Sequence, residues 1–175
     1  IGEPYFIKGT ECRSSPSIGI TLFLDHHHTV EEVLRQADLA MYQAKGSGRN
    51  GLRFFDPAMD AEVARRAALE NDLRSAIEAG QLRLHHQPQV DGAGRVVGAE
   101  ALVRWCHAER GWVSPAEFIP IAEESGLILP LGAWVLDEAC RQLAAWASMP
   151  SLQHLTLAVN ISARQFQQDD FVAQV

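Results

Sequence analysis

The sequence lacks any run of about 18 or more apolar residues, the length that a membrane-spanning helix needs. Its first residues also lack the basic start and apolar centre of a signal peptide. We therefore expect no membrane segment in this chain and a location in the cytoplasm. The chain starts at Ile1 rather than at a methionine. It is therefore expected to belong to a longer protein, whose preceding regions could tether it to a membrane.

Cysteine is scarce, and the few that occur have no pattern. The three cysteines are an odd number, form no Cys-x-x-Cys pair, and have no histidine at the spacing of a zinc site. This excludes a disulfide framework and a zinc finger. The three residues, Cys12, Cys106 and Cys140, are expected to be reduced thiols in a cytosolic protein.

Positive charge is also in short supply. The 15 Lys and Arg residues are outnumbered by 22 Asp and Glu residues, which gives a formal net charge of −7. This argues against a large contact surface for nucleic-acid phosphates, so polymeric nucleic acid is not an expected partner. A small anionic ligand remains compatible, because a few well-placed Arg, Lys or metal ions can bind one within an acidic protein.

The run EALVRW at 100–105 places two charged residues in an otherwise apolar, strand-like stretch. Because successive strand residues alternate between faces, one face carries Glu100, Leu102 and Arg104. The opposite face is wholly apolar and consists of Ala99, Ala101, Val103 and Trp105. A buried charge needs a partner, a metal or a ligand, so this strand is a candidate wall of a site. The alternative is an edge strand whose charged face is simply solvated.

The first part of the chain is predicted to contain a hairpin and a helix. Short apolar runs at 4–8 and 17–24, bounded by Gly, Pro and Ser, predict two strands that pair with each other. Thr29 and Glu32 have the spacing of a capping box, which predicts a helix over 30–45.

The exit of this helix is basic and rich in glycine. Lys45 is followed by Gly-Ser-Gly and then by Arg49. Such an exit can hold a phosphate, but a lysine in the last turn and a glycine at the cap also end ordinary helices. These residues alone favour the ordinary helix end.

A short strand at 52–57 and a long helix over 58–79 are expected next. The helix carries charge all round, so it is predicted to connect two globular units. The expected organisation is therefore a first domain over 1–56, a linker helix over 57–80 and a second domain over 81–175.

The second domain is expected to begin with an antiparallel hairpin. Strand-like runs at 82–90 and 95–105 flank a glycine-containing turn at 91–94. Gln87 lies in the first of these strands. A buried glutamine with a free amide would suit a nucleobase edge, although glutamines more often satisfy backbone groups.

Two helices and a strand are expected after the hairpin. Ser114-Pro-Ala-Glu predicts the start of a helix over 115–125. A second helix is predicted over 131–147, followed by a strand over 154–162 in which Asn160 is the one amide near the end. The predicted core face of the second helix consists of Leu136, Ala139, Cys140, Leu143 and Trp146.

The region from about residue 70 onward resembles the opening part of an EAL domain, the family of cyclic di-GMP phosphodiesterases. The resemblance rests on HHQP at 85–88, GAEALVRW at 98–105, SPAEFIPIAEESGLI at 114–128, GAWVLDEAC at 132–140 and VNISARQF at 159–166. Residues 17–50 resemble the final part of a GGDEF domain, the diguanylate cyclase family, through SIGI at 17–20 and ADLAMYQAKGSGRN at 37–50. The order fits the tandem GGDEF-EAL signalling proteins of bacteria.

The resemblance implies roles for particular residues. Glu100 and Asn160 match positions that hold a catalytic Mg or Mn ion, both being hard oxygen donors. Arg104 matches a residue that contacts a ligand phosphate, and Gln87 and Leu102 match positions that line the dinucleotide pocket.

In the GGDEF family the residues that match Lys45 and Arg49 reach the GTP phosphates, which reverses the local preference for an ordinary helix end. The cyclase's signature loop would lie before Ile1, and the EAL family's later acids and catalytic lysine would lie after Val175. His86 stands where the family usually has tyrosine.

The fold that the resemblance implies is α/β: the last part of a GGDEF domain, a linker helix, and the start of a TIM-like EAL barrel with an antiparallel first hairpin. A full barrel needs about 250 residues and about 100 are present, so we expect an open barrel that tends to self-associate.

The leading function hypothesis is metal-dependent hydrolysis of cyclic di-GMP to the linear dinucleotide by a longer protein, with this chain alone inactive. The alternatives are a module that binds cyclic di-GMP without cleaving it, and a regulatory or dimerising remnant that binds nothing.

Overall fold

The first part of the chain contains a β-α-β unit. Its elements are β3 (Ile18–Ile20), α1 (Val30–Gly46) and β4 (Leu52–Phe54). The two strands pair in parallel, and α1 makes the crossover that a parallel pair requires. The predicted capping box is confirmed, because the Glu32 N–H donates to Thr29 Oγ1 at 3.2 Å and the Thr29 N–H donates to Glu32 Oε2 at 3.0 Å.

The predicted pairing of 4–8 with 17–24 is wrong. β1 (Tyr5–Ile7) instead pairs antiparallel with β2 (Thr10–Cys12). Lys8 and Gly9 connect them, with φ angles of 49° and 84°. Positive φ at both central residues is the geometry of a type I′ turn, which joins adjacent strands with two residues. The second predicted strand is therefore left to pair with β4.

The computed structural model describes residues 4–24, 28–48 and 50–174, and it divides into two compact units after Arg65. The division falls within α2 (Ala58–Glu78), which confirms the long helix predicted from the sequence. Its later part does more than connect, because Leu69, Leu73 and Ala76 are fully buried in the core of the second unit.

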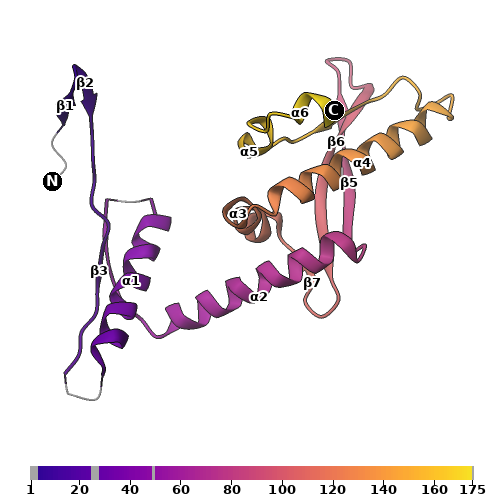
Figure 1. Cartoon of the computed structure of the whole chain (residues 1–175). Coiled ribbons are helices and arrows are strands. Elements are labelled where there is room, and N and C mark those ends of the chain that lie inside the picture. Colours follow the sequence, from indigo (N-terminus) through magenta and orange to yellow (C-terminus); the bar gives the residue numbers. More distant parts are fainter. Residues whose placement is uncertain (1–3, 25–27, 49, 175) are drawn as a thin grey trace. The chain divides into compact units, whose positions relative to one another are not determined.

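A four-stranded sheet forms the centre of the second unit (Figure 1). The predicted hairpin is confirmed as β5 (Leu82–Val90) and β6 (Val96–His107), with Leu82 opposite Trp105 at one end and Val90 opposite Val96 at the other. β6 also pairs antiparallel with β7 (Gly111–Val113) and parallel with β8 (Thr156–Val159). Among the described residues β5, β7 and β8 each pair with β6 alone, so the sheet is open on both sides.

Helices cover one face of this sheet. α3 (Pro115–Ser125) matches the prediction, and Gly126, with φ of 86°, ends it. α4 (Ile128–Ala147) starts three residues earlier than predicted and contacts both β5 and β8. Proline is tolerated in a first helical turn, so Pro130 does not delay the start. Two short helices follow, α5 (Ala163–Phe166) and α6 (Phe171–Gln174).

The core lies between the helices and the apolar side of the hairpin. Trp105 is completely buried, its ring meets Phe118 edge-on at 5.7 Å, and its Nε1–H donates to Gln81 Oε1 at 3.1 Å. The predicted core face of α4 is only partly right, because Cys140 and Leu143 are exposed. Its buried residues are Ile128, Leu131, Gly132, Val135 and Ala139. No helix in the described ranges is long and apolar enough to cross a membrane.

Candidate functional site

The two faces of β6 differ as the alternation of its sequence predicted. Ala99, Ala101 and Trp105 are buried beneath the helices. The opposite face carries Glu100, Leu102 and Arg104, all half-buried. β6 pairs with strands on both of its sides, so the alternative of an edge strand is wrong. The charged face of a central strand is therefore the candidate site.

Glu100 and Asn160 meet on this face. The parallel register sets Glu100 opposite Ala158, and the alternation of side chains then turns Asn160 to the same side as Glu100. Asn160 lies just past the carboxyl end of β8, and its Nδ2 donates to Glu100 Oε1 at 2.6 Å. Asn160 is exposed. The structure thus brings together the two residues to which the sequence assigned a metal.

The chemistry of this pair fits a hard cation. The oxygen and nitrogen of an asparagine amide exchange places when the amide turns over, so Asn160 can present Oδ1 beside the Glu100 carboxylate. Carboxylate and amide oxygens are ligands that Mg²⁺, Mn²⁺ and Ca²⁺ accept. The described residues contain no group of three or more His, Cys, Asp and Glu arranged for a metal. Other ligands would have to be water, substrate or further protein groups.

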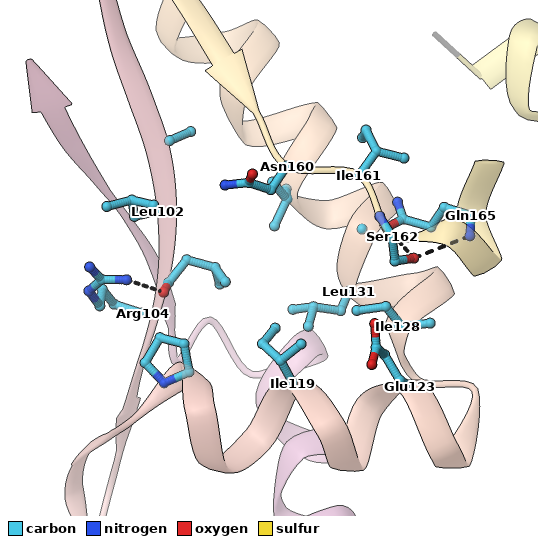
Figure 2. Close-up of a pocket in the computed structure, with 15 residues that line it drawn as sticks. Leu102, Arg104, Ile119, Glu123, Ile128, Leu131, Asn160, Ile161, Ser162 and Gln165 are labelled. Carbon is cyan, nitrogen blue, oxygen red and sulfur yellow. Dashed lines mark hydrogen bonds between the residues drawn. The ribbon is translucent and has the colours of Figure 1, made fainter. Parts of the chain in front are cut away.

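Gln87 and Leu102 extend the site along the same face. Gln87 lies directly opposite Glu100 in the register, so both side chains project from the same side of the hairpin. Gln87 is exposed, which leaves its amide accessible to a ligand. In Figure 2, Leu102 and Arg104 extend from β6 on the side away from Ile119 and Leu131.

Arg104 lies opposite Arg83 in the register, so both guanidinium groups project from this face. The Arg104 Nη1 donates to the carbonyl of Val103 at 2.8 Å. Within the described part of the chain, no carboxylate forms a salt bridge with Arg104. A half-buried guanidinium without an acidic partner is suited to an anion such as a phosphate.

A cavity of about 300 Å³ opens behind the site, between β6, the helices and the segment after β8. Its walls are mainly apolar and include Ile119, Ile128, Leu131 and Val135. Asn160, Ser162 and Gln165 line it on the side of β8 (Figure 2). The position of Gln165 in this wall was not predicted from the sequence, although Ser162-Ala-Arg-Gln165 has the spacing of a capping box.

His86, the departure from the family pattern, does not lie on the charged face. It is opposite Ala101 and turns toward α4, where its ring lies 5.5 Å from that of Trp146. Its Nε2 is buried and has no hydrogen-bond partner among the described residues. The substitution therefore affects packing beneath the sheet rather than the side chains around Glu100.

The second candidate site, in the first unit, is only partly described. Lys45 lies in the last turn of α1 and is exposed. Arg49 lies outside the described residues. The role of these two residues at a GTP phosphate stays a prediction.

The fold and the site thus describe an α/β chain whose central strand carries a charged face beside the carboxyl end of a parallel neighbouring strand. The EAL domain model matches residues 70–175, and the diguanylate cyclase GGDEF domain model matches residues 1–51. The chain belongs to the EAL domain family, and its GGDEF match precedes the EAL match in the order of a tandem GGDEF-EAL protein.

Relatives with assigned names agree with this. The chain is 46% identical over 95% of its length to the bifunctional diguanylate cyclase/cyclic di-GMP phosphodiesterase MucR of Pseudomonas aeruginosa, covering 24% of that protein. It is 44% identical over 93% of its length to the cyclic di-GMP phosphodiesterase PdeR of Escherichia coli, again covering 24%. The chain thus spans about a quarter of the length of these relatives.

Solved structures show the same fold. The PaMucR phosphodiesterase in complex with c-di-GMP superposes with a TM-score of 0.59 at 46% identity, covering 62% of this chain and 44% of that one. The Xanthomonas citri FimX EAL domain in complex with c-diGMP gives a TM-score of 0.56 at 26% identity, covering 66% and 44%. EAL domains in general depend on a divalent metal ion.

Proposed function

We propose that this chain includes the first part of the phosphodiesterase domain of a longer protein that opens cyclic di-GMP to the linear dinucleotide. The observation that carries the proposal is the contact between Glu100 and Asn160, which pairs two oxygen-donor side chains where the parallel pairing of β6 with β8 ends. Glu100 and Asn160 would hold a Mg or Mn ion. When bound, the ion would supply Lewis acidity that makes a water molecule a better nucleophile and offsets charge on the phosphate.

The other residues of the charged face have binding roles. The Arg104 guanidinium can donate two parallel hydrogen bonds to a phosphate, and its charge is not offset by a described carboxylate. The Gln87 amide can both donate to and accept from a guanine edge. Leu102 lies between Glu100 and Arg104 along the face and offers an apolar contact to the dinucleotide.

The alternative is a module that binds cyclic di-GMP without cleaving it. Both of the visible oxygen donors are present and in contact, which favours catalysis. Residues 1–175 alone are proposed to be inactive, because a closed barrel needs about 250 residues. The open edges of β5 and β8 would then favour self-association.

The domains are proposed to cover 1–56, 57–80 and 81–175, in a bacterial cytoplasmic protein. Lys45 and Arg49 are proposed to contact GTP phosphates in the GGDEF portion. The partner is cyclic di-GMP, and no polymeric nucleic acid is proposed to bind.

The test is turnover of cyclic di-GMP with Mn²⁺ by the full-length protein that contains this chain. Linear dinucleotide should form with the unchanged protein and be abolished by Glu100→Ala. Glu109→Ala, which removes an exposed carboxylate from the turn after β6, is the matched control and should retain activity. Saturable binding without product would establish the binding module instead.

A further inference from the structure

Gln165 is a buried polar residue, with 6% of its surface exposed. Its Oε1 accepts hydrogen bonds from the Ser162 N–H at 3.1 Å and from the Ser162 hydroxyl at 3.0 Å. The Ser162 Oγ accepts in return from the Gln165 N–H at 3.2 Å (Figure 2). These reciprocal bonds close the turn that starts two residues after Asn160.

Because Gly132 has no side chain, the Gln165 amide can pack directly against α4 at this position. A Cβ atom built on Gly132 would overlap the Gln165 side-chain amide, coming within 2.7 Å of Oε1 and closer still to Nε2. No other residue type would allow this approach without a shift. The neighbours of Gly132 on α4, Leu131 and Val135, are fixed in the core, so the helix offers a rigid support for Gln165.

Asn160 is held between two fixed points. On one side, Val159 pairs with Ala101 in the parallel sheet. On the other side, Ser162 is fixed through Gln165 to α4. We infer that the contact between Gly132 and Gln165 is a positioning device that sets where the Asn160 amide lies relative to the Glu100 carboxylate. Its effect on catalysis rests on the function proposed above, but its effect on Asn160 does not.

Variants of Gln165 separate hydrogen bonding from volume. Gln165→Leu keeps most of the volume but cannot accept the two bonds from Ser162. Gln165→Glu keeps an acceptor oxygen at the same place, as in the usual capping box. Gly132→Ala pushes on Gln165 from the opposite side. Gly92→Ala is the matched control, because a Cβ there meets no atom within 4 Å.

The direct readout is the side-chain amide signal of Asn160 in the NMR spectrum of the ¹⁵N-Asn-labelled full-length protein, assigned by its loss in Asn160→Asp. Glu100→Ala should shift this signal, because it removes the acceptor at 2.6 Å. Gln165→Leu and Gly132→Ala should shift it too, whereas Gln165→Glu and Gly92→Ala should leave it in place.

Turnover provides the second readout. Gln165→Leu should raise the Mn²⁺ concentration for half-maximal turnover about 10–100-fold, as is typical for residues that orient metal ligands. In Gln165→Glu this Mn²⁺ concentration should stay close to that of the unchanged protein. If the unchanged protein does not cleave cyclic di-GMP, the proposed function fails while the NMR comparison still decides the positioning role. An Asn160 signal that moves in Glu100→Ala but stays unchanged in Gln165→Leu and Gly132→Ala overturns the inference. Should Gln165→Leu fail to fold, Gly132→Ala decides alone.

Discussion

The Asn160 amide lies 2.6 Å from the Glu100 carboxylate, although 60 residues separate the two in sequence. The contact follows from the parallel pairing of β8 with β6, because this register turns both side chains to the same face of the sheet. β8 ends at Val159, one residue before Asn160. Ligand sites in α/β folds characteristically lie at the carboxyl ends of parallel strands. The position of this pair is therefore a consequence of the fold.

Replacement of Arg104 tests the anion contact. Arg104→Ala should weaken binding of cyclic di-GMP by about 10- to 100-fold, because a charge-assisted hydrogen bond contributes roughly 1.5–3 kcal/mol. Arg104→Lys should recover only part of this, since an ammonium cannot make the paired contact. The measurement is calorimetric titration with Ca²⁺ in place of Mn²⁺.

The matched control for this titration is Arg74→Ala, which removes an exposed guanidinium on α2 that pairs with Glu70 at 3.3 Å. Equal affinity of the Arg104→Ala and Arg74→Ala proteins would show that Arg104 does not contact the ligand.

The turn between β5 and β6 should make stability depend on acid. The Arg95 N–H, the Arg95 side chain and the Ala93 N–H all donate to the Asp91 carboxylate, and they hold the pKa of Asp91 below its usual range. A lowered folded-state pKa stabilises the fold above the ordinary aspartate pKa of about 3.9. This contribution is lost as the pH falls through the lowered value.

Asp91→Asn should therefore unfold at lower temperature than the unchanged protein near pH 7, and the difference should shrink below about pH 4. The measurement is the thermal unfolding midpoint across this range. Asp137→Asn, at an exposed carboxyl on α4, is the control and should show no such convergence. A difference in unfolding midpoint between Asp91→Asn and the unchanged protein that stays constant with pH would contradict the account.

The sequence predicted some of these features well, for reasons that are local. The alternation in β6 identified the charged face, and the capping box at Thr29 located α1, because both patterns depend on near neighbours. The first hairpin was missed because Lys8-Gly9 is not one of the usual turn pairs, although it adopts the type I′ geometry. The close contact between Gln165 and Gly132 joins two segments that are distant in sequence, so no local sequence pattern predicts it.

The His86 side chain is expected to lower the free energy of unfolding. Its Nε2 is buried without a hydrogen-bond partner among the described residues, and an unsatisfied buried polar group costs about 1–3 kcal/mol. His86→Phe keeps a ring against Trp146 and removes the polar atom, so the free energy of unfolding should rise by about 1 kcal/mol. Chemical denaturation measures this change.

His85→Phe is the control for this prediction, because His85 is exposed on the opposite face, where its ring meets Trp112 at 5.4 Å. It should leave the free energy of unfolding nearly unchanged. A loss of stability in His86→Phe would indicate that the Nε2 atom has a partner in solution.

The most direct test of the central claim is a double-mutant cycle of Glu100→Ala and Asn160→Ala, measured as turnover of cyclic di-GMP with Mn²⁺ by the full-length protein. If the two residues act together on one metal ion, each single variant should lose nearly all the activity that the double variant loses, because residues that act as a unit are not additive. Losses that multiply independently, or activity that survives Glu100→Ala, would contradict the account.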